Sequence, residues 1–274
     1  MTYTVASKPA GWVVSDIHQL TFHFMEIKGR PVRRHIPLST LRGIFMAFIA
    51  KANPVLASEI HESSGIPPYT TDLVVHGPHV EITFTLFSRK LNEAMQSFIL
   101  EHDTTTYRLG PVEAVLSKIK VDRVSLGDIV DAARSLSKFK IVFKKPTYFK
   151  DKSGMIVLYP EPVAMFQNLA HIWNEITGDL EPIDTSAFCE WVGTSIQITS
   201  HKLKTSQISL GKDRRVTGFV GWAKFKVQAP EHEFSPIINM LLQFARFSHV
   251  GGNRTTGLGA IKTYLVKITE AMEK

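Results

Sequence analysis

One order of secondary-structure elements occurs twice along the 274-residue chain, and this repetition restricts the fold more than any other sequence feature. Alternating apolar residues predict strands, and longer apolar stretches with helical spacing predict helices. The first copy is expected to contain a strand over 20–27, a helix over 38–52, strands over 72–76 and 80–87, a helix over 91–100 and a strand over 112–124.

The second copy repeats this order after a helical linker expected over 128–137. Its predicted elements are a strand over 139–143, a helix over 162–177, strands over 195–202 and 217–227, a helix over 236–247 and a strand over 261–268. An apolar segment over 187–192 has no assigned place. The repeated order is that of the ferredoxin-like, or RRM-like, motif. The sequence therefore predicts an α+β protein of two tandem ferredoxin-like domains, spanning 1–130 and 138–274.

Positive charge is concentrated near the C-terminus. Residues 1–199 contain 20 Lys and Arg against 20 Asp and Glu, whereas residues 200–274 contain 12 against 5. The whole net charge of +7 therefore falls in the last quarter of the chain. Such a one-sided basic region is typical of a protein that binds a polyanion, and it favours nucleic acid over a merely solubilising surface.

Cysteine usage and hydropathy indicate a cytoplasmic setting. The single cysteine, Cys189, excludes an intramolecular disulfide. Apolar runs such as 44–50 are too short to span a bilayer, and residues 7–16 interrupt any signal-peptide core. We expect a cytoplasmic protein without membrane association, present as a monomer or homodimer.

A glycine-rich segment follows the last predicted helix. Four glycines within nine residues allow the backbone to approach an anion closely. A nucleotide-binding P-loop would lead from a strand into a helix, whereas this segment leads from a helix into a strand, which makes a nucleotide-phosphate enzyme a remote alternative. The residues expected to contact nucleic acid here are His249, Gly251, Gly252, Asn253, Arg254, Thr255, Thr256, Gly257 and Gly259.

Further basic residues lie on the predicted hairpin over 196–227 and on the helix before the loop. Alternating cations on a strand project from one face, where they could contact a phosphate backbone. This set comprises Lys202, Lys204, Lys212, Arg214, Arg215 and Arg246. Phe219 and Trp222 match the aromatic signature of RRM domains only superficially, so we expect both in the core.

His61 is the candidate catalytic residue of the first domain. Asn53 and Pro54 predict the start of a short helix, and Gly65 its end, which places His61 in the last turn. A lone exposed histidine of this kind is usually inert. His76 and His79 flank a turn without cysteine or acidic partners, so neither a metal site nor a cofactor is expected.

Three stretches together resemble the CRISPR-associated endoribonucleases that process repeat RNA, within the RAMP superfamily. The first stretch runs from 41–44 through 53–57 to Ile60-His61-Glu62, the second is the GF-x-G strand over 217–221, and the third is the glycine-rich loop. The likeness spans nearly the whole chain. It implies metal-independent cleavage in which a 2′-hydroxyl attacks the adjacent phosphorus and leaves a 2′,3′-cyclic phosphate.

On this resemblance His61 takes the position of the catalytic histidine, as general base or general acid. Some members add a tyrosine and a lysine, but the corresponding positions here hold Met46 and Pro67. Cationic stabilisation of the transition state must then come from Arg42, or from Arg254 or Arg246. His35 is an alternative base, and His249 stands where the family usually has the first glycine of the loop.

Two classes of function remain open. The first is an endoribonuclease that converts CRISPR repeat transcripts into guide RNA and associates with other Cas proteins. The second is a non-catalytic RNA-binding subunit of a CRISPR effector complex, since related tandem folds serve as such subunits.

Overall fold

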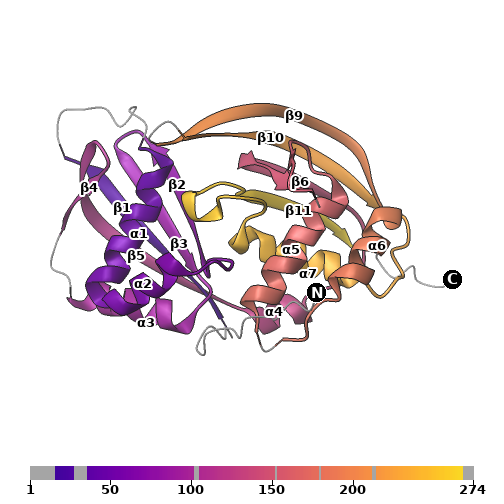
Figure 1. The fold of residues 1–274 in the computed structure, drawn as a ribbon, viewed down its shortest axis with the longest axis horizontal. Coiled ribbons are helices and arrows are strands. Elements are labelled where there is room, and N and C mark those ends of the chain that lie inside the picture. The colour runs from indigo at the N-terminus through magenta and orange to yellow at the C-terminus, as the bar shows by residue number, and fades with distance from the viewer. Residues whose placement is uncertain are drawn as a thin grey trace.

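The computed structural model describes residues 16–27, 36–101, 105–151, 153–178, 180–211 and 214–267. Two antiparallel sheets with helices packed on one face of each lie beside one another (Figure 1). This arrangement confirms the prediction of an α+β chain with two tandem ferredoxin-like units.

The first unit contains a five-stranded sheet in the order β2-β3-β1-β5-β4. Its first and third motif strands, β1 and β3, pair at the centre, as the ferredoxin-like motif requires. Strand β4 is an addition that extends the edge beyond β5. The elements are β1 (Asp16–Glu26), α1 (Leu38–Ala52), α2 (Pro54–Glu62), β2 (Tyr69–His76), β3 (His79–Leu86), α3 (Arg89–Glu101), β4 (Thr106–Leu109) and β5 (Val112–Ser125).

The second unit repeats the topology, with the sheet order β11-β6-β10-β9. The apolar segment that had no assigned place forms α6, and the linker helix α4 is shorter than expected. The elements are α4 (Leu126–Asp131), β6 (Leu136–Thr147), β7 (Phe149–Lys150), β8 (Ile156–Val157), α5 (Pro162–Ile176), α6 (Thr185–Ser195), β9 (Ile196–Gly211), β10 (Arg214–Val227), α7 (Ser235–Ser248), the 3₁₀ turn η1 (Arg254–Thr256) and β11 (Ile261–Lys267).

The alternating apolar residues of each strand supply the two cores. On β1, Leu20, Phe22 and Phe24 are buried beneath the helices, and the Phe22 ring meets Phe84 of β3 at 5.5 Å between centroids. The core of the second unit also includes Phe87, whose ring lies 5.7 Å from Phe244 of α7. The two units therefore share apolar contacts in addition to the linker.

Strand β2 forms a polar seam with the second unit. The Thr70 hydroxyl donates to the Phe247 carbonyl at 2.9 Å, and the Thr71 hydroxyl donates to the Thr255 carbonyl at 3.1 Å. The Lys145 ammonium donates to the Leu73 carbonyl at 2.6 Å. The seam thus places the glycine-rich loop directly against the first unit.

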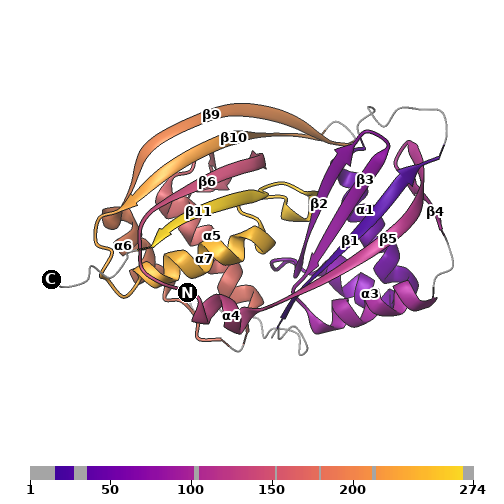
Figure 2. The ribbon, with the colours of Figure 1, turned by 180° about the vertical axis from the view of Figure 1, so that it is seen from behind.

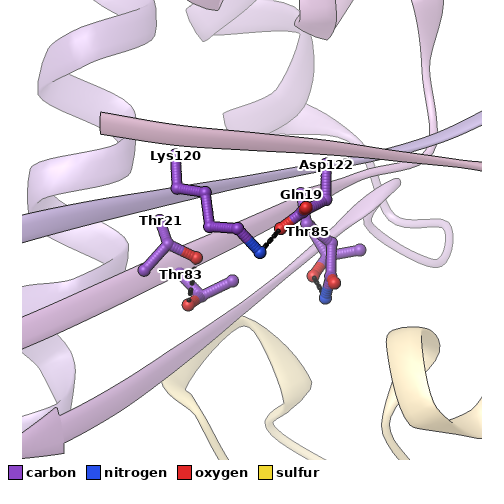
Figure 3. Close-up of polar contacts among 6 residues, drawn as sticks. All are labelled: Gln19, Thr21, Thr83, Thr85, Lys120 and Asp122. Atoms are coloured by element: carbon purple, nitrogen blue, oxygen red, sulfur yellow. Dashed lines mark hydrogen bonds and ion pairs between the residues drawn. The ribbon is translucent and has the colours of Figure 1, made fainter. Parts of the chain in front are cut away.

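The long hairpin of β9 and β10 arches from α6 towards the first unit, as both views show (Figure 1, Figure 2). Strand β9 contacts α1 there. On the face of the first sheet opposite its helices, polar side chains bond one another: Gln19 with Thr85, Thr21 with Thr83, and Lys120 with Asp122 (Figure 3).

Candidate functional site

The glycine-rich loop has a backbone path that few other residues could follow. His249 and Asn253 have φ values of 57° and 56°, and Gly251, Gly257 and Gly259 also have positive φ. A side chain at Gly251 would overlap the Tyr148 carbonyl oxygen, and one at Gly259 would overlap the Val250 carbonyl oxygen. Glycine is required at these two positions by both conformation and space.

Side chains from the second unit tie this loop in place. The Asn168 side-chain oxygen of α5 accepts the Gly251 N–H at 2.7 Å, and the Asn253 amide donates to the Tyr148 hydroxyl at 3.0 Å. Burial raises the pKa of Tyr148, opposed by the charge of Arg214 and by the bond from Asn253. The effect of Arg214 shows that the tip of the basic hairpin lies near the loop.

Arg254 and His249 lie inside the loop. Arg254 is 7% exposed, its guanidinium donates to the Ser248 carbonyl at 2.7 Å, and burial lowers its pKa to about 10. The His249 ring Nδ1 lies 3.0 Å from the Leu258 carbonyl oxygen. Desolvation lowers the pKa of His249 to about 4, against the attraction of Asp72. Both side chains therefore support the loop from within, and the buried cation remains charged at neutral pH.

Of the other loop residues, Gly252, Asn253 and Thr255 are partly exposed, whereas Gly251, Thr256, Gly257 and Gly259 are buried. The exposed part of the loop is thus short. It presents backbone, one amide side chain and one hydroxyl.

His61 lies exposed in the last turn of α2, as expected. Asn53 caps this helix by accepting the Leu56 N–H at 3.0 Å, and Pro54 follows in the first turn. Leu56 and Ile60 are buried and anchor the helix to the first core. The segment after His61 then turns towards the second unit.

Two adjoining clefts flank the glycine-rich loop. A cleft of about 450 Å³ lies between the segment 64–67, which follows His61, and residues of α5 and the loop. A second cleft of about 540 Å³ lies on the other side, beside Tyr148. Asn168, His171 and Gly251 line both. His171 is an exposed imidazole that sequence reasoning missed, because a histidine on an amphipathic helix carries no signal of what it faces across the domain boundary.

Arg42 connects α1 to the loop. Its charge and its polar side chain, with Thr255, act to lower the pKa of the Tyr69 phenol, so Arg42 lies near both residues. The Tyr69 ring stacks on Phe45 at 3.8 Å between centroids, and burial raises the pKa of the phenol to about 12. The structure therefore brings Arg42 to the edge of the glycine-rich loop.

The other candidate cations are spread over the second unit. Lys202 and Lys204 are exposed on β9, Arg214 and Arg215 are exposed at the start of β10, and Arg246 is exposed in the last turn of α7. His35 and Lys212 lie outside the described residues.

The structure agrees with the prediction for one of the two aromatic residues of β10 and contradicts it for the other. Phe219 is fully buried, as predicted. Trp222 is half-buried on the opposite face of the sheet, so its predicted place in the core is wrong. Successive residues of a strand point to opposite faces of the sheet, so Phe219 and Trp222, at an odd and an even position, lie on different faces.

The described residues contain no group of His, Cys, Asp and Glu that could hold a metal ion. None of the helices in the same ranges is long and apolar enough to cross a membrane.

Two tandem ferredoxin-like units with a glycine-rich loop between them define the fold class, and a solved structure of a Cas6 protein shares this fold. Residues 141–261 match the family model of the CRISPR-associated endoribonuclease Cas6. A Cas6 endoribonuclease of Mycobacterium tuberculosis is 35% identical over 125 residues, which are 46% of this chain but 38% of that relative. The matched segment thus spans well under two thirds of the relative's length. These findings confirm the resemblance seen in the sequence.

Solved structures agree on the fold. A Cas6 product complex superposes with a TM-score of 0.77 at 18% identity, over 90% of this chain and 100% of that chain. Cas6 of Thermus thermophilus gives a TM-score of 0.72 at 17% identity, over 92% and 100% of the two chains. A Cas6-related protein of Pyrococcus furiosus gives 0.59 at 13% identity, over 90% and 98%.

Proposed function

We propose that the protein is an endoribonuclease that cuts CRISPR repeat RNA within the cleft between the two units. The observation that carries the proposal is the cleft of about 450 Å³, whose walls are the segment after His61 and the glycine-rich loop with α5. The match of residues 141–261 to an endoribonuclease family supports the same activity.

The proposed reaction needs two proton transfers. The 2′-hydroxyl attacks the neighbouring phosphorus, the bond from phosphorus to the 5′-oxygen breaks, and the products carry a 2′,3′-cyclic phosphate and a 5′-hydroxyl. His61 accepts the proton of the 2′-hydroxyl, and His171 on the opposite wall donates a proton to the leaving oxygen. Imidazoles suit both steps, because their usual pKa of about 6.5 lies near neutral pH.

Positive charge around the loop stabilises the anionic transition state in this proposal. Arg42 lies at the edge of the loop, and the buried Arg254 adds a fixed charge beneath it. A charge held in a low-dielectric setting acts more strongly than one in water. The exposed cations of the hairpin, Lys202, Lys204, Arg214 and Arg215, hold the phosphate backbone of the RNA.

Cleavage of a repeat RNA in excess EDTA tests the proposal. We expect a cut that persists in EDTA and is abolished by a single 2′-deoxy substitution at the scissile nucleotide, while affinity is retained. Cleavage of the 2′-deoxy substrate would exclude the mechanism. Tight binding of intact RNA after long incubation would instead assign the chain to the non-catalytic RNA-binding subunits.

A further inference from the structure

The face of the second sheet opposite its helices combines aromatic rings with lysines. Lys140 of β6 lies between two rings, with its Nζ 5.0 Å from the Trp222 centroid and 5.7 Å from the Tyr264 centroid. Lys224 lies 5.6 Å from Trp222, and Lys262 lies 4.9 Å from Tyr264. This aromatic–lysine face spans three adjacent strands, β10, β6 and β11.

The charges of this face are unusually one-sided. Lys224 is directly opposite Lys140, and Lys226 is directly opposite Lys138, on the paired strands β10 and β6. Like charges directly opposite each other destabilise a sheet. Among the described residues that point to this side from β6, β10 and β11, none is acidic. The face therefore lacks the counter-charge that would offset its internal repulsion, and an anionic ligand would supply it.

The first sheet provides an internal comparison, because it has the same topology. Its corresponding face has internally paired polar side chains, including Lys120, whose ammonium donates to Asp122 at 2.7 Å (Figure 3). Thr21 and Thr83 likewise bond each other at 3.0 Å. A basic, aromatic face is therefore not a consequence of the fold. Of the two sheets, only the second has such a face.

We propose that the aromatic–lysine face binds a single-stranded segment of RNA, with bases stacked on Trp222 and Tyr264. This proposal rests on the proposed function only in taking RNA as the ligand, and the face is separate from the cleft lined by His171. Stacking on sheet aromatics is how four-stranded RNA-binding sheets hold two or three bases. Neighbouring strands are about 4.8 Å apart. Because β6 lies between β10 and β11, the rings on these two strands can each receive a different base.

The lysines have a defined part in this binding. In the unbound chain their ammonium groups lie over the ring faces. An incoming base replaces the ammonium over the ring, and the flexible lysine stem lets the charge move to a neighbouring phosphate.

A labelled oligouridine of about 12 nucleotides, too short to pair with itself, is the probe for this face. Substituting both rings, Trp222→Ala with Tyr264→Ala, should weaken its binding about tenfold or more, since each stacked base contributes substantially. The variant Trp222→Phe should bind more tightly than the double alanine variant, because it keeps an aromatic ring at position 222. Lys140→Gln with Lys224→Gln should lower the salt slope by about 1.4, whereas the control pair Lys118→Gln with Lys120→Gln on the first sheet should leave it unchanged.

Unaltered oligouridine affinity and salt slope in both the ring and the lysine variants would overturn the proposal. Photocrosslinking of wild-type protein to 5-iodouridine RNA checks it without any substitution. Crosslinks at Trp222 or Tyr264 support the stacking, and crosslinks confined to the glycine-rich loop exclude it. Because these measurements need no cleavage, they also distinguish failure of this face from failure of the proposed nuclease.

Discussion

Asn168 on α5 accepts a hydrogen bond from the backbone N–H of Gly251 at 2.7 Å, and so ties the glycine-rich loop to the helix that lines both clefts. The loop's exposed backbone is therefore oriented by a residue outside the loop. This bond explains how a segment rich in glycine can present a defined surface.

Asn168→Ala should lower the free energy of unfolding by about 1 kcal/mol, because it leaves the Gly251 N–H without its partner. RNA affinity should fall as well, since the loop loses its anchor to α5. Urea unfolding and a binding titration measure the two effects. Gln167→Ala, at the neighbouring position, is the stability control, and an equal loss in both variants would contradict the assigned role of the bond.

Gly259→Ala should destabilise the protein far more than Gly154→Ala. Both glycines have positive φ, so both alanines incur a backbone cost of roughly 1 kcal/mol. Only at Gly259 would the added Cβ overlap backbone, that of Val250, whereas nothing lies within 4 Å of a Cβ at Gly154. Thermal unfolding of the two variants separates the steric effect from the conformational one; similar melting temperatures would show that the loop can relax.

The buried His249 should make stability depend on pH. Burial lowers its pKa to about 4 in the folded chain, so the unfolded chain binds a proton that the folded chain excludes. Stability is therefore fully present above about pH 6.5 and is lost as the pH falls towards 4, by up to about 3 kcal/mol from this residue. His18, whose pKa is also lowered by burial, contributes in the same direction.

His249→Asn isolates that contribution, because asparagine keeps a polar side chain at this position, where φ is 57° and ψ is 178°, and does not titrate. Its unfolding free energy should change less than that of wild type between about pH 7 and pH 4.5. Parallel losses in the two proteins would assign the acid sensitivity to other groups.

The exposed cations of the hairpin should control affinity through salt. Changing Lys202, Lys204, Arg214 and Arg215 together to glutamine should weaken repeat-RNA binding and reduce the slope of log affinity against log salt by up to about 4. The control changes four exposed cations of the first unit, Arg89, Arg108, Lys118 and Lys120. An equal effect of the two sets would point to general charge instead of a hairpin contact.

Period-two and helical patterns were sufficient to predict the order of the two repeated motifs, but they did not predict β4, β7 or β8 and left the α6 segment without an assigned place. Phe22 and Phe24 alternate with polar residues on β1, and the structure buries both. Patterns within one segment do not, however, state what a residue faces across a sheet or a domain boundary. Trp222 was misplaced for that reason, and His171 was overlooked.

The number of charges along the sequence likewise does not reveal which cations share a face of the folded chain. Lys138 and Lys140 fall in the neutral part of the chain, yet β6 lies between β10 and β11 and brings both beside the basic C-terminal strands. Arg254, expected from the sequence to contact nucleic acid, is buried in the structure and donates to the Ser248 carbonyl. Linear sequence predicted the basic character of the second unit, whereas the sheet order decides which cations share a face.

The single-turnover cleavage rate of His61→Ala, measured with excess enzyme on a repeat RNA in EDTA, tests the central claim most directly. Removal of a general acid or base typically lowers a rate by ~10²–10⁴-fold, so we predict a loss of that size with little change in affinity. His79→Ala, at another exposed histidine of the first unit, should cleave like wild type. Cleavage by His61→Ala at the wild-type rate would contradict the account.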